Sequence, residues 1–488
     1  FGGDLIVAER ELRELLAMRA GDTFSRERII ESVKRITDRL GNDGYSFANV
    51  NPVPDVDRDK RVAAFTFFVD PGRRVYVRRV NVVGNSRTQD AVIRRELRQL
   101  ENSWYSLEKI ARSKERLQRT GYFSEVNIET PSVAGTTDQV DVVVTVTEKN
   151  TGSLNFGVGY SQADKLTVSA SVSQANIFGS GNQLAFQVNN GSINRIYSLT
   201  YVNPYWTVDG IAAGIDLFRR DVDTADLTVT EYKTTSTGVG VNFGIPITEY
   251  DTVRFGLTGE HTRLSIDPSL APARYLDFIN LFGERTDTFR ANLGYSRDTR
   301  DSLTYPTKGW LTDLSLEVGM PPGDLRYYRA SVQQQFLWTP ARLSWLTLLA
   351  NAEFGYADGT GGKPLPFFKN FYAGGVGSVR GYEAASLGPL DRNGDVLGGN
   401  RRVVGNLEFL FPMPGLKDKS VRLSTFVDAG YVWGKDDKIK AADIRASTGL
   451  AVSWDSPVGP LKFSFSYPFR TQDGDKLERF QFQLGRIF

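Results

Sequence analysis

Arg380 is the side chain in this sequence whose surroundings most clearly indicate a fixed polar partner. It is the only charged residue of the glycine-rich stretch 371–382. An arginine in such company favours a carboxylate, because its planar fork can bind both carboxylate oxygens at once. Glu408 and Asp428 are the candidates, since each lies in a strand-like run and points away from the apolar face. We predict that these acids hold a loop motif made of Val379, Arg380, Gly381 and Tyr382.

Covalent catalysis has little material in this sequence. There is one histidine, His261, and no cysteine, which excludes disulfides and thiolate metal sites. Gly362 and Lys363 are followed by Pro364, where a phosphate-binding loop needs Ser or Thr. The acidic run 55–59 lacks the glycine of a calcium loop. We therefore expect no enzyme activity, no metal and no cofactor, and the net charge of +2 argues against a nucleic-acid partner.

The N-terminal part is predicted to consist of two small α+β modules, residues 1–73 and residues 74–150. Both read as β-α-α-β-β, which makes an internal repeat of about 75 residues. The first copy is expected to lack its opening strand. The sheets leave open edges that could accept a strand from another chain, although the modules could also be spacers. The spacing of apolar residues predicts helices in four ranges: 5–19, 25–40, 90–100 and 107–119.

Residues 151–488 change to a period of two, which is typical of strands with two different faces. Sixteen such runs can be counted, and an even number fits a single-chain bacterial barrel. No run of about 18 apolar residues is present, so no transmembrane helix is predicted. The polar face is too hydrophilic for a second buried sheet. The expected fold is a transmembrane β-barrel of 16 antiparallel strands with the long loop 357–399 folded into its lumen.

The first and last strands must close this barrel, and both contain glycine, which weakens a strand. A weakly paired seam could open locally, or the glycines could simply let the strands bend. The candidate seam residues of the first strand are Asn155, Phe156, Gly157, Val158, Gly159 and Tyr160. Those of the last strand are Phe480, Phe482, Leu484, Gly485 and Phe488.

The whole chain resembles a known family. The two modules are similar to POTRA domains, and the barrel with its Arg380 motif is similar to the BamA-type assembly factors of bacterial outer membranes. A full family member has five POTRA modules, so this chain would hold the last two. Five further segments support the resemblance: 150–153, 203–205, 371–375, 398–400 and 473–476.

The resemblance implies that the protein folds and inserts other β-barrel proteins in the bacterial outer membrane, with its modules in the periplasm. Arg380 matches the family's loop arginine, and Glu408 and Asp428 match its luminal acidic partners. The first and last strands match the lateral gate, and we expect the opened first strand to template a client strand. Segment 94–99 resembles a helix that docks a lipoprotein, with Glu96 as the contact. The implied partners are periplasmic-side assembly lipoproteins, unfolded β-barrel clients with their chaperones, and outer-membrane lipids.

Three other functions are alternatives to this one. A two-partner secretion pore also combines POTRA modules with sixteen strands, but it exports an unfolded client through its lumen. A passive porin would not need tandem modules or a plugging loop. An outer-membrane enzyme would need a catalytic cluster, and His261 is the only histidine that could serve in one.

Overall fold

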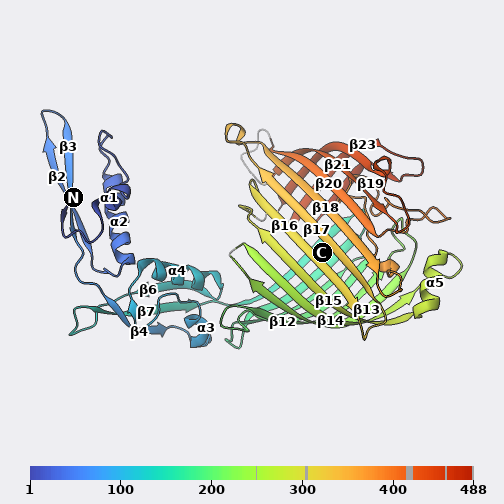
Figure 1. Ribbon diagram of the computed structural model, residues 1–488, viewed down its shortest axis with the longest axis horizontal. Helices are drawn as coiled ribbons and strands as arrows, with labels where there is room; N and C mark the ends of the chain where they lie inside the picture. Colours follow the sequence, from blue (N-terminus) through green and yellow to red (C-terminus); the bar gives the residue numbers. More distant parts are fainter. Residues whose placement is uncertain (249, 303–305, 414–420, 457–458, 486–488) are drawn as a thin grey trace. The chain divides into compact units, whose positions relative to one another are not determined.

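The computed structural model describes residues 1–248, 250–302, 306–413, 421–456 and 459–485. The chain divides into two compact units (Figure 1). The first comprises Phe1–Gly152 together with Ala175–Asn182, and the second comprises Ser153–Gln174 together with Gln183–Phe488. Across the described ranges, no helix has both the length and the apolar character needed to cross a bilayer.

The first module packs two helices on a three-stranded sheet of order β1-β3-β2. Ser25 caps the second helix, because Ser25 Oγ accepts a hydrogen bond from Arg28 N at 3.4 Å. The expectation that this module lacks an opening strand was wrong, since β1 pairs in parallel with β3. The elements are β1 (Gly2–Gly3), α1 (Glu9–Glu14), α2 (Arg26–Asn42), β2 (Asn49–Asp57) and β3 (Val62–Asp70).

The second module has a four-stranded sheet of order β5-β4-β7-β6, one strand more than expected. Its core lies between this sheet and α4 and includes Val80, Leu117 and Val144, which are at most 3% exposed. α3 ends at Arg94 instead of near Leu100, because the next turn donates Arg98 N to Ser113 Oγ of α4 at 2.8 Å. The elements are β4 (Tyr76–Val83), α3 (Asp90–Arg94), β5 (Ser103–Trp104), α4 (Leu107–Arg119), β6 (Phe123–Glu129) and β7 (Gln139–Glu148).

The tip of the hairpin between β9 (Lys165–Ile177) and β10 (Asn182–Asn190), residues 175–182, packs with the second module in the same compact unit. Asn176 Nδ2 donates to Thr88 Oγ1 at 2.9 Å, and Gln89 N donates to Gly179 O at 2.9 Å. Gly179 has a φ of 70°, and a Cβ there would lie 1.9 Å from the carbonyl oxygen of Arg87. Only glycine therefore permits this close approach of two backbones.

Glu148, at the end of β7, organises the turn that receives this tip. Its carboxylate accepts hydrogen bonds from Thr88 N at 2.6 Å, Arg87 N at 3.0 Å and Ser86 Oγ at 2.9 Å. Burial by itself raises the pKa of Glu148, but these hydrogen bonds favour the ionised form and bring the pKa below its ordinary value. The ionised carboxylate thus stabilises the turn at neutral pH.

Sixteen antiparallel strands close into a barrel, as predicted (Figure 1). Each strand pairs with its sequence neighbours, and β25 pairs with β8 to close the ring. The strands are β8 (Gly152–Ser161), β9 (Lys165–Ile177), β10 (Asn182–Asn190), β11 (Asn194–Asn203), β12 (Ala212–Asp223), β13 (Lys233–Pro246), β14 (Asp251–Ser265), β15 (Arg285–Asp298), β16 (Gly309–Met320), β17 (Tyr327–Trp338), β18 (Thr347–Gly359), β20 (Arg401–Pro412), β21 (Val421–Trp433), β22 (Arg445–Ser456), β23 (Gly459–Arg470) and β25 (Phe480–Leu484).

Side-chain exposure alternates along the wall and identifies its two faces. In β23, Phe465 and Tyr467 are each 62% exposed, whereas Ser464 and Ser466 are buried. In β21, Val427 is 44% exposed and Asp428 is 0% exposed. Apolar side chains thus face outward, where lipid covers them, and polar side chains face the lumen. Apolar and polar residues alternate in the sequence because successive side chains of a strand point to opposite faces of the wall.

The loop between β18 and β20 forms its own core against the inner wall. Phe371, Val379, Tyr382 and Leu387 are at most 3% exposed and belong to one apolar cluster. A second cluster joins this loop to α5, where the rings of Tyr275 and Phe367 stack at 3.7 Å between centroids. The remaining elements are α5 (Ala273–Phe282), η1 (Ala341–Leu343), η2 (Phe367–Lys369), β19 (Gly381–Tyr382), η3 (Ala441–Asp443) and β24 (Leu477–Glu478).

Candidate functional site

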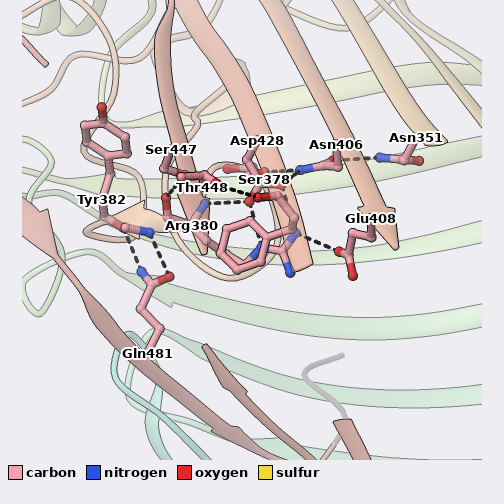
Figure 2. Close-up of polar contacts among 12 residues, drawn as sticks. Asn351, Ser378, Arg380, Tyr382, Asn406, Glu408, Asp428, Ser447, Thr448 and Gln481 are labelled. Carbon is pink, nitrogen blue, oxygen red and sulfur yellow. Dashed lines mark hydrogen bonds and ion pairs between the residues drawn. The ribbon is translucent and has the colours of Figure 1, made fainter. Parts of the chain in front are cut away.

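Arg380 lies inside the barrel between both predicted acids (Figure 2). Its Nε donates to Asp428 Oδ2 at 2.6 Å, and its Nη2 donates to Asp428 Oδ1 at 2.8 Å. The same Nη2 donates to Glu408 Oε1 at 2.7 Å. The Arg380 side chain is 9% exposed, that of Asp428 is 0% exposed and that of Glu408 is 19% exposed. The guanidinium therefore binds one carboxylate through both oxygens and reaches a second, wetter one.

Two neighbouring strands bring these acids together. Glu408 lies in β20 and Asp428 in β21, and the ladder sets Asn406 opposite Asp428 and Phe426 opposite Glu408. The two acids are therefore diagonal neighbours on one face, a separation that a long side chain can span. Their inward orientation follows from the period of two, since the flanking Leu407 is 39% exposed on the outer face.

Gly381 lets the loop backbone lie directly against the wall. Its φ is 89°, and a Cβ at this position would lie 2.9 Å from Ser466 Cβ and 3.0 Å from Pro468 Cγ of β23. Any side chain would therefore push the loop away from the wall. This contact fixes the position along the strands at which the preceding residue, Arg380, meets the acids.

Four further residues complete the site, and the sequence reasoning did not single them out. The ring of Phe426 lies 3.5 Å from Arg380 Cζ, and Asn406 Nδ2 donates to Asp428 Oδ1 at 2.9 Å. Asn406 Nδ2 also donates to Ser378 O at 2.7 Å, and Ser447 Oγ donates to Arg380 O at 2.5 Å. The available signal was parity, since Asn406, Phe426 and Ser447 share the inward phase of their strands.

The other motif residues are buried in the same region. Val379 and Tyr382 are both 0% exposed. The Tyr382 hydroxyl donates to the carbonyl oxygen of Arg470 at 2.8 Å, at the end of β23. The motif thus contacts β20, β21, β22 and β23, four consecutive strands of the wall.

The loop also binds the segment that leads into the last strand. β19 and β24 form a two-stranded sheet, in which Gly381 pairs with Glu478 and Tyr382 with Leu477. Gln481 of β25 is 1% exposed, its Nε2 donates to Tyr382 O at 2.8 Å, and its Oε1 accepts from Gly381 N at 3.2 Å (Figure 2). The sequence reasoning named its outward neighbours and passed over this inward residue. The loop motif that contains Arg380 is therefore hydrogen-bonded directly to β25, the last strand of the barrel.

A second buried ion pair holds the connector before the last strand. Arg445 Nε donates to Asp475 Oδ2 at 2.9 Å, and the two side chains are 7% and 8% exposed. Asp475 belongs to segment 473–476, one of those that resemble the family. The pair fixes this connector on β22, beside the loop that it contacts.

The seam is short within the described residues. β25 pairs with β8 at Gln483↔Ser161 and Leu484↔Tyr160. Gly485 has a φ of 79°, and its N donates to Pro460 O of β23 at 2.8 Å. Neighbouring strands elsewhere pair along much longer ladders, such as that from Asp251↔Arg297 to Arg263↔Arg285.

The predicted seam residues fall on both faces of the wall. The ring centroids of Tyr160 and Phe482 lie 6.1 Å apart across the seam. Phe488 lies outside the described residues. The outward residues that remain more than a third exposed are Phe156, Val158, Tyr160 and Phe480. The first-strand residues of opposite phase are Asn155, Gly157 and Gly159.

Glu96 does not offer an exposed carboxylate. Its side chain is 7% exposed, and its Oε2 lies 2.7 Å from Arg116 Nη2 of α4. The residue follows α3 instead of lying within a helix. A direct contact to a docked protein is therefore at odds with this geometry, whereas a role in holding the α3–α4 surface is compatible with it.

Comparisons with known proteins give a consistent result. A family model for the Omp85 superfamily domain matches residues 176–488, and a POTRA model, described as a surface antigen variable number repeat, matches residues 1–72 and 75–149. The chain is 38% identical to the outer membrane protein assembly factor BamA of Neisseria meningitidis, over 99% of this chain. It spans 65% of that relative's length, which is less than two thirds.

Two solved structures resemble this one to different degrees. BamA from Haemophilus ducreyi lacking POTRA domains 1–3 matches with a TM-score of 0.87 and 31% identity, over 99% of this chain and 98% of that one. CdiB from Acinetobacter baumannii matches with a TM-score of 0.55 and 15% identity, over 98% of this chain and 88% of that one, which shows a likeness of fold alone. The resemblance inferred from the sequence motifs is thus confirmed. With its barrel matched along most of its length and both modules matched as well, this chain belongs to the Omp85 superfamily.

Proposed function

We propose that the protein folds and inserts β-barrel proteins into the bacterial outer membrane, with its two modules in the periplasm. The observation that carries the proposal is the seam, where the described parts of β25 and β8 share two residue pairs. A short ladder can open at smaller cost than a long one, and an opened strand edge offers backbone groups to a client strand. The relatives' printed name, outer membrane protein assembly factor, supports the same function.

The loop motif supports a seam that can open while the barrel stays whole. Arg380, Tyr382 and Gln481 tie the loop to strands β20 to β23 and to β25 itself. The last strand is therefore held from inside the barrel, independently of its pairing with β8. Opening at β8 then leaves β25 in place instead of unravelling the wall.

The free energy for insertion would come from the client. A folding barrel buries apolar surface in lipid and pairs its backbone groups, and both changes are favourable. The proposal needs no nucleotide and no covalent step. The protein's part is to lower the barrier by offering a strand edge at the membrane.

The runner-up function, a two-partner secretion pore, would pass an unfolded client through the lumen. The buried loop core and the double ion pair at Arg380 occupy that lumen and argue against such passage. The higher identity and TM-score of the BamA structure, against those of CdiB, favour assembly as well. Periplasmic lipoproteins, client chaperones and outer-membrane lipids remain the proposed partners, with the second module as the docking surface.

Depletion of the full-length protein distinguishes the two functions. An assembly factor should be needed by many unrelated outer-membrane barrels, so all of them should decline together. Loss of one exported protein, with the barrels unchanged, would instead favour the secretion pore. Quantitative proteomics of outer membranes during depletion gives the answer.

A disulfide across the seam tests the mechanism. Ser161 and Gln483 face each other in the ladder, and the chain has no natural cysteine, so the double variant Ser161→Cys/Gln483→Cys would carry the only thiols. We expect oxidation to block client insertion and reductant to restore it. The matched control is Ser315→Cys/Ser331→Cys, an opposed pair between β16 and β17. Full activity of the oxidised seam variant would refute insertion through the seam.

A further inference from the structure

The edge of β25 that faces the seam is only partly covered by main chain. β23 pairs with the other edge of β25 from Phe480 to Leu484. On the seam edge, the described residues of β8 pair with Gln483 and Leu484. Phe480 and Phe482 therefore lie beyond the end of that ladder. Open strand edges of this kind tend to capture other chains unless something covers them.

Within the described ranges, the side chain of Gln162 covers this part of the edge. Gln162 Nε2 donates to Phe480 O at 3.0 Å, and Gln162 Oε1 accepts from Phe482 N at 3.1 Å. One amide thus satisfies a backbone acceptor and a backbone donor on either side of Gln481. In an antiparallel ladder, two successive peptide groups of a neighbouring strand would make these two bonds, one through its N–H and the other through its C=O.

The register explains why Gln162 occupies this place. Ser161 is opposite Gln483, so the next residue, Gln162, falls opposite Phe482. The main chain leaves the ladder at this point, since Asp164 N donates to Ser161 Oγ at 2.9 Å and Lys165 Nζ donates to Gln162 O at 2.9 Å. Among the residues that the structure describes, the side chain of Gln162 continues along the edge of β25.

The chemistry of the side chain suits this role. A primary amide is neutral and carries both a donor and an acceptor, as a peptide group does. A glutamate would set an oxygen against Phe480 O, and a lysine would offer no acceptor to Phe482 N. Because one rotating side chain makes both bonds, they can be exchanged for those of an incoming strand without loss of hydrogen bonds.

We propose that Gln162 is a displaceable cap on the seam edge of β25. At rest it blocks capture of stray strands, and an extended segment of an unfolded client displaces it to pair with Phe480 and Phe482. The proposal rests on the proposed assembly function for the identity of the client. The recognised partner is any extended polypeptide with free backbone donors and acceptors, so recognition depends little on its side chains.

Hydrogen exchange of the Phe482 amide tests the cap in the folded full chain. Gln162→Met keeps the side-chain length and removes both bonds, and it should speed exchange of this amide about tenfold, as for loss of one hydrogen bond. Gln333→Met is the matched control, because it removes an amide contact at 3.1 Å to Asn351 on other strands. It should leave the Phe482 amide unchanged. Equal exchange in the parent and in Gln162→Met would overturn the proposal.

Capture of a probe strand tests the blocking role. The probe is a labelled peptide that copies Gly152–Ser161, the sequence of β8. Its binding to the detergent-solubilised protein should be several-fold tighter in Gln162→Met than in the parent. The same peptide with alternate backbone nitrogens methylated cannot form the ladder and should bind neither. Equal binding of the unmethylated peptide to parent and variant would refute the blocking role.

These two measurements are separate from client insertion. If the Phe482 amide and the probe respond as expected while depletion affects no outer-membrane barrel, the proposed function fails and the cap stands. If depletion removes many barrels while neither measurement responds to Gln162→Met, the cap fails and the assembly function stands.

Discussion

Arg380→Ala should release the long loop from the barrel wall while the wall itself stays closed. The substitution removes three side-chain hydrogen bonds to carboxylates, two on Asp428 and one on Glu408. It also removes the stacking of the guanidinium on Phe426. Asp428 would then remain buried, with Asn406 as its remaining side-chain donor among these residues.

The size of the effect follows from the burial of the two acids. Breaking a buried ion pair costs about 3–5 kcal/mol, since one charge is left without its partner. The lower end applies here, because the Glu408 side chain is 19% exposed and can recover water. A cost of about 3 kcal/mol raises the population of the released loop about 100-fold, at about 1.4 kcal/mol for each factor of ten. Arg380→Lys keeps the charge without the fork and should fall between Ala and the parent.

The assay is hydrogen exchange of peptide 371–382 in the detergent-solubilised full chain. Arg392→Ala is the matched control, because Arg392 lies exposed in the same loop. A cycle with Asp428→Ala and the double variant isolates the pair. The double variant should exchange at least tenfold more slowly than expected if the effects of the two single substitutions simply added in free energy. Exchange in Arg380→Ala within twofold of the parent, or an additive cycle, would refute the reasoning.

Three further predictions concern other contacts of the same framework. Gln481→Leu should loosen β25 from the loop without unfolding the barrel, because it removes the acceptor of the Gly381 amide. Exchange should be faster at the Gly381 and Gln483 amides but unchanged in β15. Gly381→Val should displace the loop, because a Cβ there would lie 2.9 Å from Ser466 Cβ, and protease cleavage within 371–382 should rise. Glu148 has a lowered folded pKa, so its stabilisation of the 86–88 turn is complete above its unfolded pKa of about 4.3 and is lost as the pH falls through the lower folded value. In the parent, protection of the Thr88 amide, normalised to its intrinsic exchange rate, should therefore decrease once the pH drops below about 4. In Glu148→Gln, this protection should already be reduced at pH 7.

Local patterns were enough for the barrel wall and for part of the site. The period of two over residues 151–488 predicts strands with two different faces, and within 461–469 Phe465 at 62% exposed and Ser464 at 3% agree with it. Ser25 was readable as a helix cap because capping involves residues three positions apart. The sequence also marked Arg380 for an acidic partner, because a single charge among glycines and apolar residues needs one.

Short-range signals failed where distant residues decide the local structure. The run 90–100 has helical spacing, yet α3 ends at Arg94, because Arg98 N is bound by Ser113 of another helix. Glu96 matched a docking contact by resemblance, and no local pattern in the sequence indicated that Arg116 pairs with its carboxylate. In both cases the competing partner comes from α4, and helical periodicity holds no information about it.

The sequence by itself determined the two-faced strands, their number and the residue types of the loop motif, because each depends on spacing of a few residues. Only the tertiary structure decided that Gln481 binds the loop and that Gln162 covers Phe480 and Phe482. Gln162 and Phe482 are 320 residues apart in the sequence. They meet only when the first strand closes on the last. Such contacts depend on ring closure and register, which no local pattern encodes.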